Sequence, residues 1–478
     1  MSKELMIERI EKAQKEIEAK RETVQQGKFR QDYHFMAETG WINDPNGLIY
    51  FKGKYHFFYQ YNPYSGFWDC MHWGHAVSED MIHWEYLPLA LAPSEVYDDH
   101  LKGGCFSGSA IEHDGKLFLI YTGTCNNGNG FEQAQCIAYS EDGIHFEKYE
   151  GNPVITAPEG VPTDLFRDPK VWKHDDTYYV VCGASKNGFA QARLYKSTDM
   201  FHWEFVNVLA ESRGEWGYMW ECPDIFALDG HRILAVCPQG VPSEAEQYQN
   251  IYQSGYFIKT EETRTVDASF KGTKETRTVN PSFIEWDMGF DFYAPQTFET
   301  PVGRRILIGW AGVPDAEYSS NPMNEGWQHS LTVPRELRYH NGKIYQLPIR
   351  ELGQLRKKEI LPEKESYVLD NGCGELIFDG IAGSSSAAIC VQIGTGCSLS
   401  YEKGLVTLQF TDDSGAGRGK RVARCEAVHK IQILMDVSIL EIYINDGEIV
   451  MTSRIFFPGK DATVRFLGQA EMIQAWQL

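Results

Sequence analysis

The first apolar pattern of the chain has the period of an α-helix. Met6, Ile10, Ala13 and Ile17 recur every three or four residues, with Glu, Lys and Arg between them. Residues at this spacing share one face of a helix. The pattern predicts a helical extension within residues 1–30 that packs by its apolar face and has no chemical role.

From residue 47 onward the period changes, and five segments repeat one arrangement. Each has an apolar run, a turn and a second apolar run, which is typical of a β-hairpin. The five segments are 47–59, 109–121, 170–182, 224–236 and 296–309.

A second pattern follows each of the first three hairpins and precedes the next one. Ser78–Glu85, Ser140–Glu147 and Ser197–Glu204 share Ser, Asp, His, an aromatic residue and Glu at the same positions. Each follows an alternating run, so each is interpreted as the turn of a second hairpin. Two hairpins make a four-stranded unit. A local duplication, 260–266 and 273–279, indicates an elongated outer hairpin in the fourth unit.

The five units begin at regular intervals. Their entry points are Asp44, Ser107, Asp168, Glu221 and Ala294, which follow one another at 53 to 73 residues. Four-stranded units repeating at such long periods are typical of a β-propeller. The pattern predicts a five-bladed β-propeller over residues 31–350, with all five entry points at one end of the central channel.

The character of the chain changes after Arg350. Residues 351–365 are charged and partly helical, which predicts a linker. Residues 366–478 contain short alternating runs, among them 405–410, 431–435 and 438–445, and the hairpin turn Asn445-Asp446-Gly447. This pattern predicts a C-terminal β-sandwich with a packing role. The whole chain is therefore predicted to be all-β apart from the short N-terminal helix.

Composition narrows the range of functions. The chain has 478 residues, of which 42% are hydrophobic, so it can bury a large core. Its net charge of −21 argues against binding nucleic acid or an anionic membrane, and no apolar run is long enough for a membrane span. Eleven cysteines without paired or histidine spacing indicate reduced thiols in a cytoplasmic protein. No metal or cofactor is expected.

Three of the five entry points carry a carboxyl group: Asp44, Asp168 and Glu221. Because like charges raise one another's pKa, bringing three acids together is costly unless a function uses them. Glycoside hydrolysis needs one carboxylate as nucleophile or base and one protonated acid for the leaving oxygen. The neighbouring aromatic residues that would offer stacking surfaces to a sugar are Trp41, Trp68, Phe106, Trp220 and Trp310.

The surroundings of two acids suggest different roles. Asp44 precedes Pro45, which disfavours a helix, so we expect it on a tight loop at a strand end. Backbone N–H groups of that loop would keep it ionised. Glu221 lies between Trp220 and Cys222. Partial burial there would favour its protonated form.

Eight motifs in order resemble glycoside hydrolase family 32, whose members include invertases and sucrose-6-phosphate hydrolases. They are WINDPNG (41–47), FYQYNP (58–63), MHWGHAVS (71–78), FSGS (106–109), FRDPK (166–170), ECPD (221–224), DFYAPQTF (291–298) and GWAG (309–312). The resemblance covers nearly the whole chain. It implies a five-bladed propeller followed by a sandwich, and hydrolysis with retention at the anomeric carbon.

The resemblance also implies roles for single residues. Asp44 would be the nucleophile, Glu221 the acid and then the base, and Asp168 a partner of the fructose hydroxyls. The residues expected to bind substrate are Asn43, Gln60, Trp68, Phe106, Ser107, Arg167 and Trp310. One departure is Phe67–Cys70, which replaces the Trp-Gly often found before MHW.

The predicted activity is that of a β-fructofuranosidase that releases fructose from sucrose, sucrose 6-phosphate or both. A short-chain fructan exo-hydrolase, acting on inulin or levan oligosaccharides, is the first alternative. An inverting family 43 glycosidase and a sugar-binding propeller without activity are further alternatives. Expected partners are these small sugars, including short fructo-oligosaccharides, and a homodimer is left open.

Overall fold

The computed structural model describes residues 2–128, 130–259, 283–318, 324–381, 389–459 and 461–478. Within these ranges the fold is all-β, as predicted. The α-helix found there is α1 (Ser2–Gln25), and the short 3₁₀ helices are η1 (Arg350–Leu355), η2 (Asp370–Gly372) and η3 (Asp413–Gly415). The predicted duplication 260–266 and 273–279 lies outside the described residues.

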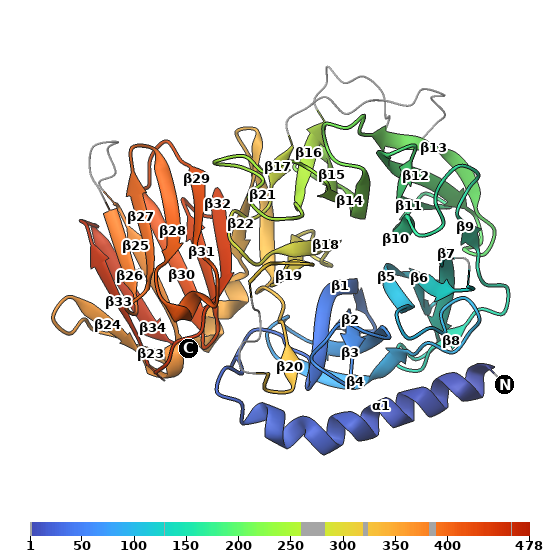
Figure 1. Cartoon of the computed structure of the whole chain (residues 1–478), viewed down its shortest axis with the longest axis horizontal. Coiled ribbons are helices and arrows are strands. Elements are labelled where there is room, and N and C mark those ends of the chain that lie inside the picture. The colour runs from blue at the N-terminus through green and yellow to red at the C-terminus, as the bar shows by residue number, and fades with distance from the viewer. Residues whose placement is uncertain (1, 129, 260–282, 319–323, 382–388, 460) are drawn as a thin grey trace.

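Five sheets between residues 40 and 348 surround a common centre (Figure 1). The first contains β20 (Trp327–Gln328), β1 (Gly40–Phe51), β2 (Lys54–Asn62), β3 (His72–Ser78) and β4 (Trp84–Leu91). The second contains β5 (Gly104–His113), β6 (Lys116–Asn126), β7 (Phe131–Ser140), β8 (Glu147–Lys148) and β9 (Ile155–Thr156).

The other three sheets have four strands each. The third contains β10 (Phe166–His174), β11 (Thr177–Lys186), β12 (Phe189–Ser197) and β13 (Glu204–Glu211). The fourth contains β14 (Met219–Leu228), β15 (His231–Gln239), β16 (Gly255–Lys259) and β17 (Ile284–Glu285). The fifth contains β18 (Tyr293–Glu299), β19 (Arg305–Trp310), β21 (Arg335–His340) and β22 (Lys343–Pro348).

The predicted hairpins are the first two long strands of each of these sheets. Strands β1, β5, β10, β14 and β18 contact one another in that order, and β18 contacts β1. The repeated Ser-x-Asp motif connects the third strand to the fourth in the first three sheets, as predicted. In the first copy, Asp80 accepts hydrogen bonds from the backbone N–H groups of Ile82 and His83.

The structure corrects the expected position of Asp44, which lies inside β1 and not on a loop at a strand end. The pairing of β1 with β2 shifts register between Ile42 and Pro45. Such a shift marks a β-bulge, which bends the strand and re-aims side chains. The residue before a proline favours an extended backbone, which suits a strand. Proline has no N–H to donate, but at a bulge the regular ladder is interrupted, so Asp44-Pro45 fits within β1.

The same irregularity occurs in the other four inner strands. The register shifts lie between Phe106 and Gly108 in β5, Arg167 and Lys170 in β10, Glu221 and Asp224 in β14, and Tyr293 and Gln296 in β18. Every predicted entry point is therefore part of a bulge or borders one.

The C-terminal part contains two six-stranded sheets. One has the order β23 (Lys358–Glu359), β34 (Met472–Gln477), β25 (Cys373–Asp379), β30 (Lys430–Asp436), β31 (Ile439–Ile444) and β32 (Ile449–Arg454). The other has the order β24 (Ser366–Leu369), β33 (Ala462–Leu467), β26 (Ile389–Ile393), β27 (Cys397–Glu402), β28 (Leu405–Phe410) and β29 (Lys420–Arg424). Buried side chains from both sheets, such as Leu376 and Leu408, form one apolar core.

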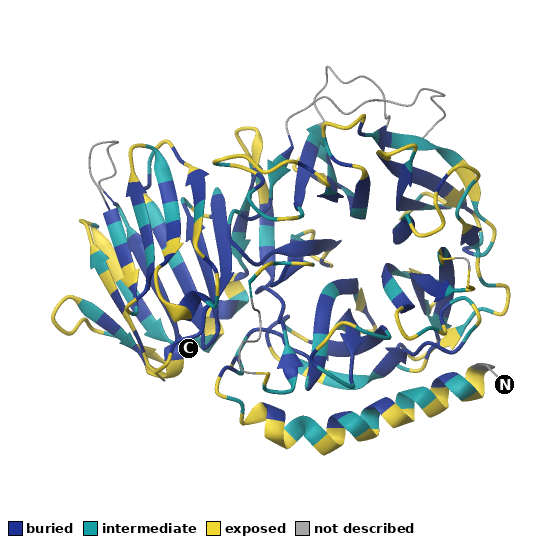
Figure 2. Ribbon diagram, viewed as in Figure 1, coloured by how far each residue is buried: buried dark blue, intermediate teal, exposed yellow. Residues whose placement is uncertain are grey.

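Helix α1 lies along the outside of the first two sheets, as Figure 2 shows by its exposed outer face and buried inner face. Met6, Ala13 and Ile17, which the sequence placed on one face, are buried, and so is Val24. No helix in the described part of the chain is both long and apolar enough to cross a membrane.

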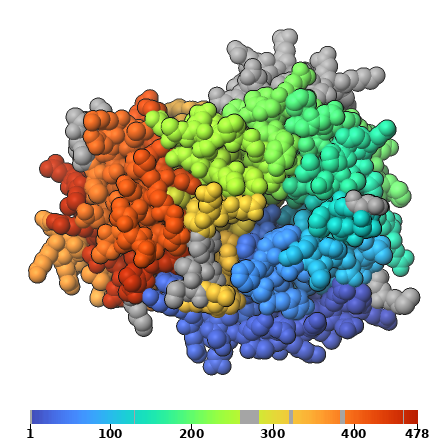
Figure 3. All heavy atoms as spheres, viewed as in Figure 1, coloured from blue at the N-terminus to red at the C-terminus, as the bar shows by residue number. Residues whose placement is uncertain are grey.

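The C-terminal sheets pack directly against the ring of sheets (Figure 3). The contact contains fully buried charged groups. His34 bonds the carboxylates of Asp436 and Glu441 through its two ring nitrogens, at 2.8 and 2.9 Å. Arg335 donates to Glu441 at 2.6 Å and to Asp287 at 3.1 Å. All of these side chains are closed to solvent, so charged groups that bond one another form part of the buried contact between the two parts.

Candidate active site

A pocket of about 630 Å³ opens at the end of the ring where the bulges occur. All ten residues that the sequence proposed as catalytic or substrate-binding line this pocket. They are Asn43, Asp44, Gln60, Trp68, Phe106, Ser107, Arg167, Asp168, Glu221 and Trp310. Four of the five predicted entry points therefore line one pocket, and the fifth, Ala294, directly follows Tyr293, which also lines it.

Asp44 is held by side chains from three of the sheets. Ser107 Oγ donates to Asp44 Oδ2 at 2.6 Å, and Asn43 Nδ2 donates to Oδ1 at 2.9 Å. Cys222 Sγ lies 3.6 Å from Oδ2. Burial raises the pKa of Asp44, and the donors from Ser107 and Asn43 oppose that rise. The expected donors were backbone N–H groups of the turn, and the observed donors are side chains.

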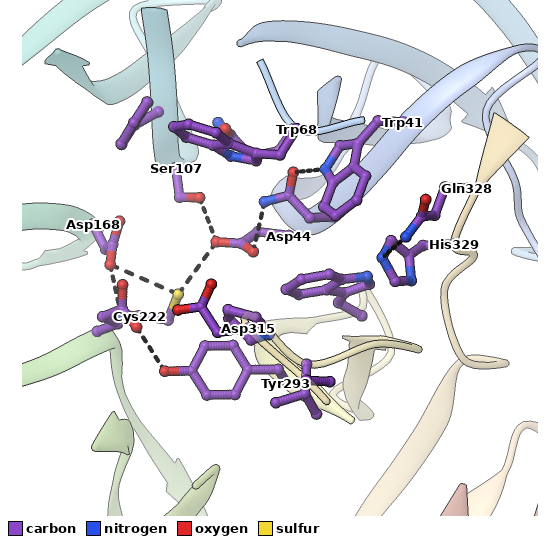
Figure 4. A pocket seen from close by; sticks show the side chains of 18 of the residues that line it. Trp41, Asp44, Trp68, Ser107, Asp168, Cys222, Tyr293, Asp315, Gln328 and His329 are labelled. Carbon is purple, nitrogen blue, oxygen red and sulfur yellow. Dashed lines mark hydrogen bonds between the residues drawn. The ribbon is translucent and has the colours of Figure 1, made fainter. Parts of the chain in front are cut away.

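Asn43 is itself fixed by a neighbour. Trp41 Nε1 donates to Asn43 Oδ1 at 2.7 Å, so the Asn43 amide is oriented with its nitrogen toward Asp44. Figure 4 shows Trp41 and Asp44 in the pocket. The hydrogen bonds from the Trp41 indole to the Asn43 amide and from that amide to the Asp44 carboxylate orient Asp44 without a charged partner.

Glu221 is surrounded by polar groups, whereas the sequence suggested only apolar neighbours. Arg167 donates to Glu221 Oε1 from Nε and Nη2 at 3.1 and 2.9 Å. Gln239 Nε2 and Tyr293 Oη donate to Oε2 at 2.7 and 2.6 Å. Both oxygens are therefore occupied, and the carboxyl group has one fixed orientation.

Asp168 is the most enclosed of the three acids. Its side chain is 5% exposed, and the backbone N–H of Cys222 donates to Oδ2 at 3.0 Å. Burial raises the pKa of Asp168 to about 7, helped by the charges of Glu221 and Asp44 and opposed by that of Arg167. Asp168 also has a positive φ of 61°, so the bulge turns its side chain away from the usual strand direction.

Aromatic rings form part of the pocket wall. Trp41, Trp68, Phe106 and Trp310 line it, and Trp68 meets Phe106 edge to face at 5.9 Å. Trp220, the fifth proposed stacking residue, does not line the pocket. It is fully buried and donates to the carbonyl of Trp216, so it belongs to the core.

Several pocket residues were not proposed from the sequence. Tyr293 and Cys222 lie inside quoted motifs, but nothing in the pattern shows that the bulge turns them inward. Asp315, Gln328 and His329 follow β19 in segments that belong to no repeat, so no periodic signal marks them. Burial lowers the pKa of His329 well below its usual value, so this ring is neutral.

The charge of the pocket is predominantly negative. Among the described lining residues, Arg167 is the only Lys or Arg, and it is ion-paired with Glu221. In the described part of the chain, no cluster of three or more His, Cys, Asp and Glu side chains is suited to hold a metal ion. The arrangement offers carboxyl chemistry to a neutral ligand that carries hydroxyl groups.

Comparisons with known proteins agree with this chemistry. Residues 34–348 match the family model described as "Glycosyl hydrolases family 32 N-terminal domain", and residues 400–475 match "Glycosyl hydrolases family 32 C terminal". The sucrose-6-phosphate hydrolase of Bacillus subtilis is 37% identical over 488 residues, which cover 98% of each chain.

Two solved structures are similar over almost the whole chain. A GH32 beta-fructofuranosidase of Bombyx mori has a TM-score of 0.86 and 34% identity, covering 98% of this chain and 97% of that one. A mutant of that protein is solved in complex with sucrose. A sucrose-6-phosphate hydrolase of Lactobacillus gasseri has a TM-score of 0.84 and 27% identity, covering 97% and 96%.

Proposed function

Because the chain belongs to glycosyl hydrolases family 32, we propose that its pocket hydrolyses β-fructofuranosides, with sucrose as the substrate. The observation that carries this proposal is the set of three carboxyl groups in one pocket, each held by different partners. The sucrose complex of the Bombyx mori relative supports the choice of sugar.

The three acids divide the chemistry between them. Asp44 attacks the anomeric carbon of the fructosyl ring and forms a fructosyl-enzyme ester. Glu221 gives its proton to the glycosidic oxygen, and the leaving sugar departs as an alcohol. Glu221 then removes a proton from water, which attacks the same carbon and releases fructose and the Asp44 carboxylate. Two displacements restore the original configuration.

The neighbours of each acid suit these roles. Asp44 must be ionised to attack, and the donors from Ser107 and Asn43 favour its carboxylate. Arg167, Gln239 and Tyr293 fix the orientation of the Glu221 carboxyl group. One of the hydrogen bonds at Oε2 gives way when that oxygen carries the proton for the glycosidic oxygen. Asp168 accepts hydrogen bonds from fructose hydroxyls and stabilises the positive charge that develops on the ring.

Sucrose 6-phosphate is the second candidate substrate, because several relatives are named for it. A phosphate group is bound by Lys, Arg or His⁺ side chains. Among the described lining residues, Arg167 is already paired and His329 is neutral. The charges of the pocket therefore favour the sugar without phosphate.

We further propose that the five sheets are the blades of a five-bladed β-propeller and that the two six-stranded sheets form a β-sandwich. The circular order of contacts from β1 to β18 and the shared core of the C-terminal sheets support this. The boundaries proposed are 1–30, 31–350, 351–365 and 366–478. A cytoplasmic location and a homodimer stay predictions.

The mechanism predicts retention of configuration, which methanol can test. Sucrose is hydrolysed in dilute methanol, and the products are followed by NMR. A fructosyl-enzyme attacked by methanol gives methyl β-D-fructofuranoside. Fructose that first appears as the α-anomer, without any methyl β-fructoside, would indicate the inverting family 43 type of reaction instead.

A further inference from the structure

Asp315 is a fourth acidic side chain in the pocket, and it lies at the rim. Asp44, Asp168 and Glu221 are buried or half-buried, whereas Asp315 is exposed. It belongs to the segment that follows β19, and Figure 4 shows its carboxylate turned toward the inside of the pocket, on the side of Tyr293.

Asp315 has one hydrogen-bond partner among the described residues. Tyr252 Oη donates to Asp315 Oδ2 at 3.1 Å. Arg167, the only Lys or Arg among the described lining residues, is paired with Glu221, so no cation of the described lining neutralises Asp315. An ionised carboxylate can accept about four hydrogen bonds. Most of its capacity is therefore free of described protein partners and open to a ligand that donates hydrogen bonds.

The position of the acids determines which part of the substrate reaches Asp315. The anomeric carbon of the fructosyl ring must meet Asp44, which lies in the interior beside Ser107. The group that leaves is bonded to this carbon through the oxygen that Glu221 protonates, so it extends from the interior toward the rim. In sucrose this group is a neutral glucosyl ring whose hydroxyl groups are donors.

We infer that Asp315 is a specificity-determining residue that accepts hydrogen bonds from hydroxyl groups of the leaving sugar. This inference rests on the proposed β-fructofuranosidase activity. Tyr252 orients the carboxylate from behind, and the face opposite Tyr252 meets the sugar. The fructosyl ring itself is bound by the inner residues and does not depend on Asp315.

The test compares two substrates that share the fructosyl group. Sucrose has a sugar as its leaving group, and methyl β-D-fructofuranoside has methanol. Asp315→Asn removes the charge and keeps the shape of the side chain, and asparagine tolerates the left-handed backbone (φ 55°) at this position. Asparagine keeps one acceptor oxygen but makes neutral hydrogen bonds in place of charge-assisted ones, which lowers kcat/KM for sucrose by about tenfold. The value for the methyl fructoside is expected to change by less than about twofold.

Two further variants separate specificity from structure. Glu317→Gln removes the same charge from an exposed residue of the same segment that does not line the pocket, and both substrates should react as with wild type. Tyr252→Phe leaves the carboxylate but removes its donor, so a smaller loss is expected, again for sucrose alone.

Two outcomes would overturn the inference. An equal loss for both substrates would place Asp315 with the fructosyl ring or with folding. An unchanged kcat/KM for sucrose in Asp315→Asn would show that the leaving sugar does not touch it. Wild-type protein that releases fructose from neither substrate would instead reject the proposed function.

Discussion

Ser107 illustrates how a single side chain tunes the proposed nucleophile. Burial raises the pKa of Asp44, and the bond from Ser107 Oγ, at 2.6 Å, is the largest opposing influence. The carboxylate form attacks, so activity falls as the pH drops through the pKa of this group. Ser107 is therefore one determinant of the acidic limb of the pH–rate profile, together with Asp168, whose pKa burial raises to about 7.

Ser107→Ala is expected to lower kcat/KM for sucrose roughly tenfold, because one bond to a charged group is lost. The acidic limb should move to higher pH, because the pKa of Asp44 rises further. Ser109→Ala is the matched control: Ser109 is buried two residues away and donates to the carbonyl of Pro169. Initial rates of the wild type and both variants between pH 4 and 8 measure this shift. An acidic limb at the same pH in Ser107→Ala as in the wild type would contradict the role assigned to Ser107.

The acids themselves could be predicted because Asp44, Asp168 and Glu221 occupy equivalent positions in a repeat. Their hydrogen-bond partners could not. Tyr293, Gln239 and Cys222 come from different strands, and their directions depend on bulges that apolar periodicity does not reveal. Asp315 could not be predicted because it lies in a segment that does not belong to the sequence repeat.

At the scale of elements, the inner strands share one structural feature, a β-bulge. All five carry a bulge at the pocket end, and Asp168, Cys222 and Ala294 have positive φ values of 61°, 47° and 46° there. A left-handed residue within a strand turns the neighbouring side chain to the other face. The bulges thus turn polar side chains into the pocket that would point in another direction from a regular strand.

Ala294 is suited to test the role of the bulge because its side chain has no functional group. Ala294→Val places a β-branched side chain at positive φ in a fully buried position, which should destabilise the protein by about 2 kcal/mol or more. Activity should fall as well, because Tyr293 would be displaced from Glu221. The same change at exposed Ala227 of β14 should cost less than about 0.5 kcal/mol. Urea unfolding measures both, and equal stability of the two variants would contradict this account of the bulge.

At the scale of the molecule, the C-terminal sheets are joined to the ring by buried charges. Burial alone would lower the pKa of His34, but its bonds to Asp436 and Glu441 outweigh burial and raise it. The sequence predicted two β-rich parts and the strands 405–410, 431–435 and 438–445, because local alternation encodes them. It could not predict this contact, whose partners His34 and Asp436 lie 402 residues apart.

His34→Gln is expected to destabilise the protein by about 3 kcal/mol near pH 6, because two buried carboxylates lose a charged partner. The folded protein binds the His34 proton more tightly than the unfolded chain. Its contribution is therefore complete below about pH 6.5 and is lost as the pH rises through the raised pKa. The difference between wild type and variant should shrink toward pH 9.

Unfolding free energies at several pH values measure this effect. The exposed His83→Gln, which loses a partner in Asp80, should show almost no difference at any pH. A His34→Gln deficit that is equal at pH 6 and pH 9 would mean that His34 is not charged in the folded protein.

The most direct test of the central claim is the initial rate of fructose release from sucrose and from sucrose 6-phosphate, measured side by side for wild type and Asp44→Asn. We expect wild type to release fructose from sucrose faster than from the phosphorylated sugar. Asp44→Asn should be folded and slower by about a thousandfold or more, because the nucleophile is missing. Near wild-type rates in Asp44→Asn, or no fructose from either sugar with wild type, would contradict the account.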